Sequence, residues 1–567
     1  MRRLLRLFAL GAAALAAAGA LFVVFTLPPR PVVLDATRSA TVAAGAYHVH
    51  TSRSDGTRSV EGIAAAAARA GLQFVIFTDH GDGTRPPDAP AYHHGVLCID
   101  AVEIPTDGGH LVALGLTQPS PYPLGGDPAD TIEDVHRLGG FAVLAHPDSP
   151  EPGLQWRAAN LPFDGVEWLN ADSEWRDETP ARLLASAARA IVRPAETIVS
   201  LFDRPRRTLQ RWDAAAARRS VFGLAAVDAH GGTILGEDRG RNRGFALAWP
   251  GYAAMFRVIS QHAILDRPLT GDARADAGAV LGAVIAGRSY SVISGYAGPA
   301  SIEFQAQQGS AAAGIGGHLP ASGVATTFRG RVPNAPGARL VLLHNGSEIR
   351  SAQGRLEYTT EAADGAYRLE ALFPGARAPW IVTNPIAIGA RDRDAVPDPL
   401  APIAAQDHVR LPLDGEWRTE SGGGSDASIG VEQSTTLIFR YRLGRDPNAG
   451  PYAAIVRPVD RERDRGFDRI VMTAHASQPM RVSVQVRLPV GPDGLRFRKS
   501  VYLDGTPRTV TVLLRDMQPV GRSTTQRPIV AHVQELLIVV DSVNTAPGSE
   551  GTLRLTDIGL GIGNTGG

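Results

Sequence analysis

The sequence has very little cysteine and no net charge. Cys98 is the single cysteine in 567 residues, which excludes an intramolecular disulfide and a cysteine-based zinc site. The 57 Lys and Arg residues balance the 57 Asp and Glu residues. A chain without excess positive charge has no strong field to attract nucleic acid or an anionic surface. We therefore expect no nucleic-acid partner, and we expect any charged substrate to be recognised by local groups.

The N-terminus carries a long apolar run. Arg2, Arg3 and Arg6 precede an uncharged segment from Leu7 to Leu27. A helix needs about 20 apolar residues to cross a bilayer, and flanking arginines favour a cytoplasmic N-terminus. The sequence therefore predicts an uncleaved transmembrane anchor, with the rest of the chain in the periplasm or at the cell surface. The alternative is a signal peptide that is cleaved near the small residues 17–20.

The pattern along the chain predicts an α/β region followed by all-β regions. Wholly apolar stretches such as Phe74–Phe77 and Phe141–Leu144 alternate with helical patterns, which is typical of a parallel sheet covered by helices. After about residue 300, alternating stretches such as Arg481–Arg487 indicate β-sandwiches. The predicted segments are an anchor (1–29), a linker (30–45), an α/β catalytic region (46–298), an immunoglobulin-like β-sandwich (299–390), a second linker (391–412) and a jelly-roll-like β-sandwich (413–567).

Histidine and carboxylate residues gather where the predicted strands of the α/β region end. His48 and His50 lie two residues apart, so both imidazoles project from the same side of a strand. Asp228 and His230 repeat this spacing. Sites in α/β folds are built at the carboxyl ends of the strands. The candidate metal ligands are His48, His50, Asp55, His80, Glu103, His110, His146, Asp228 and His230.

These candidates predict a site for two or three divalent transition-metal ions. Imidazole combined with carboxylate suits Zn, Mn or Fe rather than Ca or Mg, and the candidates are too many for one ion, which takes about four to six ligands. Such ions lower the pKa of bound water and stabilise negative charge on oxygen, as hydrolysis requires. Asp79, which precedes His80, is the candidate catalytic carboxylate; it could orient an imidazole or cap the strand end.

The motifs resemble those of the PHP (polymerase and histidinol phosphatase) superfamily. The resemblance covers residues 46–296 and implies a metal-dependent hydrolase with a distorted (β/α)7 barrel and usually three metal ions. The motifs that carry it are His48-Val49-His50-Thr51, Ser54-Asp55-Gly56, Thr78-Asp79-His80, Glu103, Ala145-His146-Pro147 and Asp228-Ala229-His230.

The same resemblance implies how the ligands divide among the ions. The anchored layout with β-domains is similar to a subgroup named for a carbamate-ester hydrolase. By resemblance, His48, His50, Glu103 and Asp228 would hold one ion, Glu103, His110 and His146 a second, and Asp55, His80 and His230 a third.

The leading functional hypothesis is a membrane-anchored hydrolase of a phosphomonoester or phosphodiester, acting on a small-molecule or envelope-derived substrate. One alternative is hydrolysis of a carboxylic or carbamic ester, or of an amide, at the same metal site. The other is a non-catalytic envelope-binding protein that uses its β-domains. In that case, Trp417, Asn448, Tyr452 and Tyr502 would be candidates for glycan contact. A β-sandwich alone does not decide between these functions.

Overall fold

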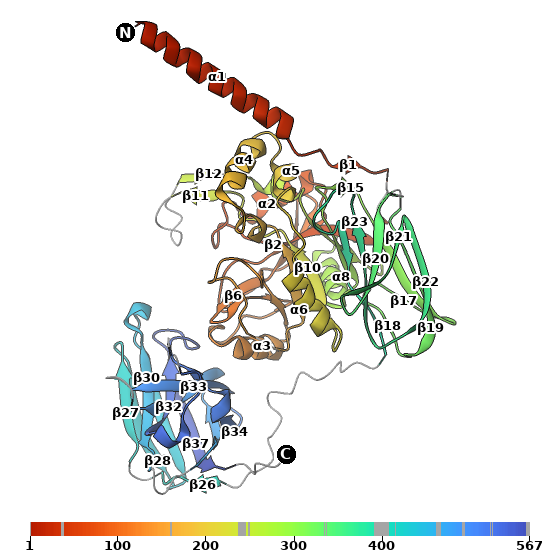
Figure 1. The fold of residues 1–567 in the computed structure, drawn as a ribbon. Helices are drawn as coiled ribbons and strands as arrows, with labels where there is room; N and C mark the ends of the chain where they lie inside the picture. Colours follow the sequence, from red (N-terminus) through yellow and green to blue (C-terminus); the bar gives the residue numbers. More distant parts are fainter. Residues whose placement is uncertain are drawn as a thin grey trace. The chain divides into compact units, whose positions relative to one another are not determined.

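The computed structural model divides the chain into two compact units (Figure 1). Unit 1 comprises residues 1–81, 87–118 and 135–395, and unit 2 comprises residues 82–86, 119–134 and 396–567. The structure describes residues 2–35, 39–158, 161–235, 245–247, 250–333, 335, 337–389, 408–413, 416–460, 466–489, 494–521, 523 and 525–562. Most of the predicted second linker, residues 390–407, therefore lies outside the described residues.

The first element of unit 1 is a long apolar helix, α1 (Arg2–Thr26). Its segment Leu5–Thr26 has a mean hydropathy of 2.4, and none of its most apolar window is buried in the protein. By length and composition this helix can cross a membrane. The same properties suit a membrane anchor and a signal sequence alike.

A large mixed sheet forms the centre of unit 1. Its strands follow the order β18-β25-β23-β24-β14-β13-β2-β3-β5-β4. The parallel part consists of β2, β3 and β5, whereas β13 runs antiparallel to both β2 and β14. The central strands are β2 (Val42–Val49), β3 (Phe74–Phe77), β4 (Ala91–His93), β5 (Val96–Asp100), β13 (Ser260–Ile264) and β14 (Ser289–Val292).

A second, five-stranded sheet of unit 1 has the order β10-β9-β8-β7-β6. Strands β8, β9 and β10 are parallel, but β7 is antiparallel to β6 and β8. Isolated parallel bridges between Val49 and Ala229 and between His80 and Glu103 connect the ends of strands from both sheets. The strands are β6 (Val102–Thr106), β7 (Gly109–Leu114), β8 (Phe141–Leu144), β9 (Gly165–Asn170) and β10 (Phe222–Ala226).

The predicted distorted (β/α)7 barrel is wrong. The described residues contain 37 strands but only eight α-helices. The strands of residues 42–292 lie in two main sheets that both contain antiparallel pairs, and in a separate antiparallel pair of β11 (Thr233–Leu235) and β12 (Phe245–Leu247). The error has a physical cause. A strand buried on both faces is apolar throughout whether its neighbours run parallel or antiparallel, so the pattern of Phe74–Phe77 does not encode strand direction.

Helices cover the sheets of unit 1. Ser59 caps the start of α2, because its hydroxyl accepts a hydrogen bond from the Gly62 amide. Helix α4 begins after Thr179, whose hydroxyl accepts from the Arg182 amide. The α-helices after α1 are α2 (Val60–Arg69), α3 (Pro128–Arg137), α4 (Pro180–Ala190), α5 (Pro194–Val199), α6 (Arg206–Ala216), α7 (Tyr252–Met255) and α8 (Ala273–Ile285).

Residues after 298 continue the large sheet of unit 1. Strand β24 (Ile381–Thr383) pairs with β14, so the predicted boundary near residue 298 lies inside one sheet. An antiparallel four-stranded sheet, β17-β16-β19-β22, packs with this region over a core that includes Phe328, Tyr367 and Trp380. The remaining strands of residues 297–389 are β15 (Ala297–Gly298), β16 (Glu303–Gln308), β17 (Ala311–Gly314), β18 (His318–Leu319), β19 (Val324–Arg331), β20 (Arg339–His344), β21 (Ser347–Gln353), β22 (Arg355–Ala362), β23 (Gly365–Leu372) and β25 (Ile386–Ile388).

Unit 2 contains two six-stranded sheets over one apolar core, in agreement with the predicted β-sandwich. One sheet has the order β28-β29-β37-β31-β34 with β26 beside β37, and the other has the order β27-β30-β36-β32-β33-β35. Phe439, Ile455 and Phe497 belong to the shared core. The strands are β26 (His408–Arg410), β27 (Arg418–Gly422), β28 (Asp426–Glu432), β29 (Thr436–Arg442), β30 (Tyr452–Pro458), β31 (Arg469–Ala476), β32 (Met480–Leu488), β33 (Leu495–Leu503), β34 (Arg508–Leu513), β35 (Gln518–Pro519), β36 (Glu535–Asp541) and β37 (Glu550–Gly561).

Residues 119–134 belong to unit 2 although they lie far from it in the sequence. Arg481 on β32 donates hydrogen bonds to both carboxylate oxygens of Asp134, at 2.7 and 2.9 Å. Lys499 on β33 donates to Asp130 at 2.6 Å. Arg481, Asp130 and Asp134 are almost completely buried. A charge buried without a partner is costly, so these pairs join the segment to the sandwich.

Candidate metal centre

The end of β2 supplies two buried imidazoles. His48 and His50 are 0% and 1% exposed, and their Nε2 atoms lie 3.1 Å apart. His48 has a φ of 65°, and the pairing of β2 with β3 shifts register between Tyr47 and Val49. This irregularity in the backbone places two side chains from one strand end around a common point.

Glu103 lies at the centre of the cluster. Its Oε1 lies 2.8 Å from both His110 Nδ1 and His146 Nε2. Its Oε2 lies 3.2 Å from both His48 Nε2 and His80 Nδ1. The Glu103 side chain is 1% exposed. One carboxylate that faces four imidazoles in this way has the arrangement of a ligand that bridges two ions.

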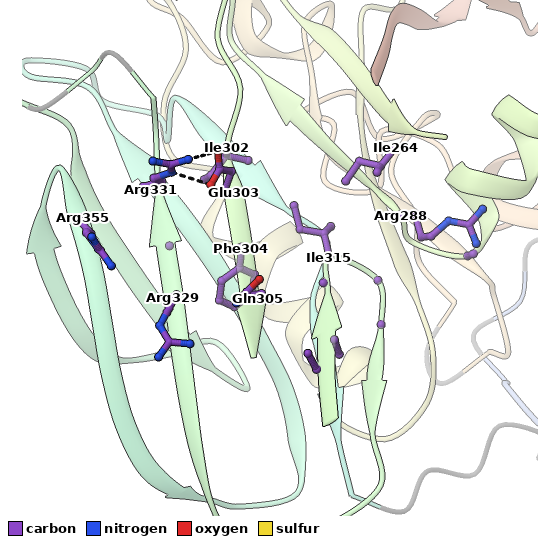
Figure 2. A pocket seen from close by; sticks show the side chains of 17 residues that line it. Ile264, Arg288, Ile302, Glu303, Phe304, Gln305, Ile315, Arg329, Arg331 and Arg355 are labelled. Atoms are coloured by element: carbon purple, nitrogen blue, oxygen red, sulfur yellow. Dashed lines mark hydrogen bonds and ion pairs between the residues drawn. The ribbon is translucent and has the colours of Figure 1, made fainter. Parts of the chain in front are cut away.

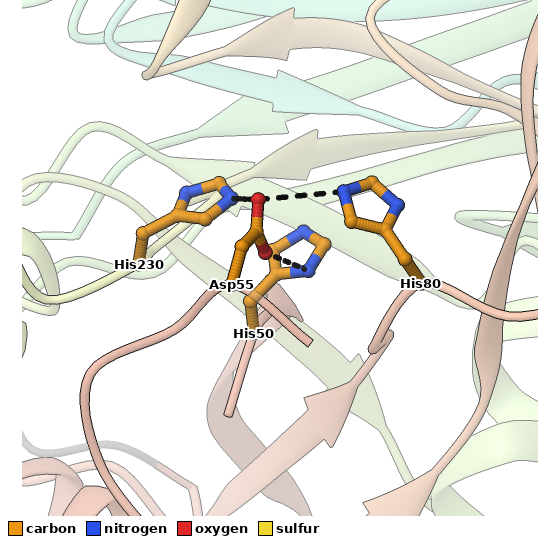
Figure 3. Close-up of side chains that lie close together, drawn as sticks. All are labelled: His50, Asp55, His80 and His230. Carbon is orange, nitrogen blue, oxygen red and sulfur yellow. Dashed lines mark ion pairs between the residues drawn. The ribbon is translucent and has the colours of Figure 1, made fainter. Parts of the chain in front are cut away.

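Three histidines lie around Asp55, at a position that is more exposed than Glu103 (Figure 3). Its Oδ2 lies 3.4 Å from His230 Nε2 and 3.6 Å from His80 Nε2. Its Oδ1 lies 3.4 Å from His50 Nδ1. The rings of His50 and His230 stack with centroids 4.3 Å apart. Asp55 is 38% exposed, so this group borders solvent.

Asp228 is a buried carboxylate with one unsatisfied oxygen. Its Oδ1 lies 3.3 Å from His50 Nε2 and 3.5 Å from His48 Nε2. Among the described residues, this buried oxygen receives no hydrogen bond. Its Oδ2 accepts a hydrogen bond from Asn170 at 3.0 Å. A buried acceptor without a donor is costly, and a cation beside the oxygen would remove that cost.

All nine predicted ligands come together in the structure. Their ligand atoms form four overlapping groups, in each of which the atoms lie within 4.8 Å of one another. The grouping differs from the one implied by resemblance, because His50 joins Asp55 and His80 joins Glu103. The groups are His50, Asp55, His80 and His230; His48, His146 and Asp228; His48, His50 and Glu103; and His80, Glu103 and His110.

This donor set fits transition-metal ions. It combines imidazole nitrogen with carboxylate oxygen, it is largely buried, and it includes the unsatisfied Asp228 Oδ1. The backbone fits the same interpretation. His48, His146 and Asp228 all have positive φ, at 65°, 30° and 47°. Left-handed backbone at a non-glycine residue is strained, and such strain clusters at functional sites.

Two functional residues were not predicted from the sequence, Glu167 and Asn170 on β9. Glu167 Oε1 lies 2.5 Å from His48 Nδ1, and its Oε2 accepts from the His146 amide at 2.7 Å. Asn170 donates to Glu167 and to Asp228, both at 3.0 Å. A carboxylate on the outer nitrogen of an imidazole fixes the tautomer that leaves the inner nitrogen free for a metal. The sequence feature that could have identified Glu167 was a glutamate within a mostly apolar strand.

Asp79, the predicted catalytic carboxylate, holds a loop instead of lining the cluster. Its Oδ1 accepts from the Thr51 amide and the Ser54 hydroxyl, both at 2.7 Å. Its Oδ2 accepts from the Thr51 hydroxyl at 2.8 Å and from Arg53 Nε at 3.1 Å. These four bonds fix the loop that leads to Asp55. Asp79 therefore acts as a positioning residue for the loop, whereas its expected role of orienting an imidazole is not seen among these bonds.

The electrostatics of the cluster reflect carboxylates surrounded by imidazoles. Burial alone would lower the pKa of His146, but its hydrogen bond to Glu103 raises it to about 8. Burial also opposes the charged form of His230, whereas Asp55 and Asp228 raise its pKa to about 10. Burial would raise the pKa of Glu103, but the charge of His48 and bonds from His110 and His146 hold it well below its usual range. Protonated imidazoles therefore keep the carboxylates charged, and a metal ion that binds the cluster would replace those protons.

Two cavities border the cluster. One, of about 400 Å³, is lined by Asp228 and His230 and otherwise mainly by apolar side chains. The other, of about 380 Å³, lies beside His146 and Glu167 and has a more polar lining. A catalytic site needs such a space next to its ligands.

A larger cavity, of about 820 Å³, lies away from the cluster between β16, β17 and β19 (Figure 2). Its arginines suggest an anion site at first. However, Arg331 is paired with Glu303 at 2.6 Å, and Arg329 donates to Gln307 and Glu357. These arginines are engaged by their own sheet.

Comparison with known proteins gives one relative. An uncharacterized protein of Methanocaldococcus jannaschii, MJ1587, is 31% identical over 138 residues, which cover 22% of this chain and 80% of that protein. The chain belongs to the same family as MJ1587. No family model matches the chain. Because MJ1587 is uncharacterized, membership assigns no activity.

Solved structures give only weak likenesses. A family 11 carbohydrate-binding module of the Clostridium thermocellum cellulase Lic26A-Cel5E is 16% identical, covers 28% of this chain and 97% of its own, and has a TM-score of 0.23. A structure described as "CBM4 structure and function" is 18% identical, covers 26% of this chain and 93% of its own, and scores 0.18. The agarase AgWH50C is 10% identical, covers 28% of this chain and 25% of its own, and scores 0.21. TM-scores this low do not establish a shared fold.

These findings correct the expected classification. The two main sheets of residues 42–292 both contain antiparallel pairs, which a (β/α)7 barrel does not. Classification of the chain as a hydrolase of PHP-barrel type is therefore replaced by a description that the structure supports. The chain is a β-rich protein with a histidine–carboxylate cluster in unit 1 and a β-sandwich in unit 2.

Proposed function

We propose that the histidine–carboxylate cluster is the active site of a metal-dependent enzyme that hydrolyses an ester. The observation that carries the proposal is the convergence of nine imidazole and carboxylate side chains, whose ligand atoms form four overlapping groups within 4.8 Å. Imidazole and carboxylate together are the ligands that transition-metal ions prefer in proteins.

The residues that would hold the ions are the nine that converge. The overlap of their groups at His48, His50, His80 and Glu103 favours two or three adjacent ions over one. When bound, such ions lower the pKa of water and stabilise negative charge on an ester oxygen. The sequence motifs that resemble the PHP superfamily support the same chemistry, and membership of that superfamily remains a prediction.

The chain's own residues prepare the site. Glu167 holds the outer nitrogen of His48, so His48 Nε2 points its lone pair into the cluster. Asp79 fixes the loop that carries Asp55 at the rim. During hydrolysis the water oxygen bonds to the ester centre, the bond to the leaving oxygen breaks, and a proton from water ends on the leaving oxygen. The adjacent cavities give the two parts of the ester their space.

We also propose that α1 remains as a membrane anchor. Its apolar segment is long enough to cross a bilayer, and Arg2, Arg3 and Arg6 precede the most apolar part. By this charge pattern the N-terminus is cytoplasmic, and the cluster lies on the opposite side of the membrane.

The experiment measures metal content and ester hydrolysis in the same protein and its variants. Full-length protein in detergent is expected to retain two or three Zn, Mn or Fe ions per chain, measured by mass spectrometry of the metals. It is also expected to hydrolyse one of two chromogenic classes, phosphoesters or carboxylic esters. His50→Ala and Asp228→Asn should lose metal and turnover together. His94→Ala, in which the replaced side chain is 48% exposed, is the matched control and should keep both.

The proposal fails if metal-supplemented protein retains no ion. It also fails if an ester is hydrolysed equally well by wild type, His50→Ala and Asp228→Asn, because the activity would then come from elsewhere.

A second candidate function is glycan binding by unit 2, in a protein that is not an enzyme. The named carbohydrate-binding modules bring this candidate forward. Of the residues predicted to contact sugar, Tyr502 packs beside Tyr122, with ring centroids 6.2 Å apart, and the Trp417 indole donates to the Pro412 carbonyl. Tyr452 and Asn448 remain the better candidates. Binding to a glycan array that is lost in Tyr452→Ala but kept in His50→Ala would establish this function.

A further inference from the structure

The apolar cavity next to the cluster has a lining suited to a hydrocarbon chain. It has a volume of about 400 Å³, within the range of about 300–1,000 Å³ that is typical of ligand pockets. Asp228 and His230 lie in its wall, so one part of the cavity meets the metal centre. Burial raises the pKa of the Glu174 carboxyl in the same wall to about 8, which keeps that group largely neutral near pH 7. Apolar lining residues include Ala171, Trp175, Leu183, Ala187, Ile198 and Leu201.

Helix α4 forms part of this wall and presents a second apolar face to the outside. Leu183, Ala187 and Ala190 line the cavity at helical spacing. Leu184 and Ile191 are 76% and 77% exposed. Because a helix turns about 100° per residue, these two share a face that is about a quarter turn from the cavity face. Large exposed apolar side chains on one face mark a surface that meets a partner or a membrane.

The end of α4 touches the end of α1. Arg189 Nε donates to the Thr26 hydroxyl at 3.1 Å, and its guanidinium lies over the Phe22 ring at 5.6 Å. Arg193 donates to the Pro28 carbonyl at 2.5 Å. Thr26 is the last residue of the apolar helix. The contacts therefore place α4 where α1 leaves the membrane, and Figure 1 shows α4 and α5 beside this end of α1.

Other side chains near α4 suit a membrane surface. Trp175 is 43% exposed, and its indole donates to Asp172. Tryptophan with a polar end is enriched at the boundary between lipid and water. Val192 is 57% exposed beside Ile191. Arg189 and Arg193 supply positive charge near anionic headgroups. Apolar and basic groups thus occur together at the C-terminal end of α4, and Trp175 lies shortly before its start.

We propose that this cavity takes the apolar chain of a lipid-like ester drawn from the membrane that α1 enters. The outer face of α4 rests on that membrane, the chain of the amphiphile lies along Leu183 and Ala187, and its ester group lies at Asp228 and His230. Cleavage of the ester rests on the proposed function, whereas binding of the chain does not. The inference therefore names the substrate class as membrane amphiphiles rather than water-soluble esters.

Photo-crosslinking of the full-length protein tests where lipid chains reach. The protein is placed in nanodiscs that contain a phospholipid with a diazirine in its acyl chain, irradiated and mapped by mass spectrometry. Adducts on Leu5–Thr26 are expected in every sample and serve as an internal standard. The proposal expects further adducts on cavity residues such as Leu183, Ile198 and Leu201. Adducts confined to α1 would overturn it.

Variants on both faces of α4 sharpen the test. Ala187→Phe adds bulk at the exposed side of the cavity, which Ala187 lines, and should lower the cavity adducts about tenfold relative to α1. Ala181→Phe, on the exposed start of α4, is the matched control and should leave them unchanged. Leu184→Glu with Ile191→Glu should lower the cavity adducts while preserving those on α1. Val324→Glu, at a valine that is 43% exposed in β19, is the control.

The two proposals fail in different ways. Cavity adducts without turnover of any ester would keep the lipid site and reject the hydrolase. Metal-dependent turnover of soluble esters without cavity adducts would keep the hydrolase and reject the lipid substrate. Cavity adducts that persist unchanged in both Ala187→Phe and the double glutamate variant would also reject the proposed route from the membrane.

Discussion

Two buried acidic clusters can be compared, one in each unit. In unit 2, the carboxylates of Asp130 and Asp134 are paired with Arg481 and Lys499, so the cations belong to the chain. In unit 1, Glu103 is equally buried but is surrounded by imidazoles, which carry positive charge only when protonated. Arginine and lysine keep their positive charge near pH 7, whereas the imidazoles of unit 1 can exchange their protons for metal ions. This exchange is the physical reason to expect metal ions in unit 1 rather than in unit 2.

The comparison also separates the roles of the two clusters. The pairs of Arg481 hold residues 119–134 to the sandwich and leave no charge uncompensated. The unit 1 cluster keeps Asp228 Oδ1 unsatisfied and holds three residues with positive φ. A buried cluster that retains such costs is typical of a functional site, since structure alone does not require them.

Removal of the Arg481 guanidinium should have the largest effect on stability. Arg481→Met leaves Asp130 and Asp134 buried without Arg481, and loss of one partner from a buried pair costs about 3–5 kcal/mol. Hydrogen exchange followed by mass spectrometry should show loss of protection in residues 119–134. Arg331→Met, which breaks an exposed pair with Glu303, is the control and should cost about 1 kcal/mol or less. Equal effects of the two variants would contradict the role given to Arg481.

Removal of metal ions should have the next largest effect on stability, and this effect should be confined to unit 1. A ligand at about 100 times its Kd stabilises a fold by about 2.7 kcal/mol, so chelation should lower the Tm and metal addition should restore it. Hydrogen exchange should locate the change at the strand ends around Glu103 and Asp228. The same metal-dependent shift should remain in Arg481→Met. A Tm that is insensitive to metal would remove the distinction between the two clusters.

The sequence predicted the members of the histidine–carboxylate cluster better than the fold around them. His48 with His50, and Asp228 with His230, could be nominated because alternate residues of a strand share a face. The barrel prediction was wrong because apolar stretches that are buried on both faces do not encode the direction of the strand. The antiparallel position of β13 between β2 and β14 depends on contacts between residues far apart in sequence.

Other features also depended on contacts that local patterns do not contain. Glu167 stands alone in its strand without a second ligand nearby, so no spacing marked it as the partner of His48. The grouping of His50 with Asp55 and His230 follows from how two loops meet. The pairing of Asp134 with Arg481 joins residues that lie 347 positions apart. Such contacts are set by the tertiary fold, which a single sequence does not reveal.

The carboxylate behind His48 offers a smaller test of the metal cluster. Glu167→Gln keeps the shape of the side chain but removes the charge that fixes the imidazole. Loss of such a partner typically lowers metal affinity about 10- to 100-fold. Competition with a chromogenic chelator measures this affinity. Glu303→Gln, at an exposed glutamate outside the cluster, is the control and should bind metal as the wild type does. Unchanged affinity in Glu167→Gln would mean that His48 is oriented by other contacts.

The last prediction is a dependence of stability on pH that comes from Glu174. Burial, followed by the charges of Asp177 and Asp203, raises its pKa to about 8 in the folded chain, from 4.5 for the free side chain. The folded state therefore binds this proton more tightly than the unfolded state, and stability falls as pH rises from about 4.5 to 8. Glu174→Gln removes this proton, so the Tm of the wild type minus that of the variant should decrease across this range. Glu61→Gln, at a side chain that is 73% exposed, should show a constant difference. A constant difference for Glu174→Gln as well would show that this wall of the apolar cavity is more hydrated than its burial indicates, and would weaken the case for a hydrocarbon chain beside Asp228.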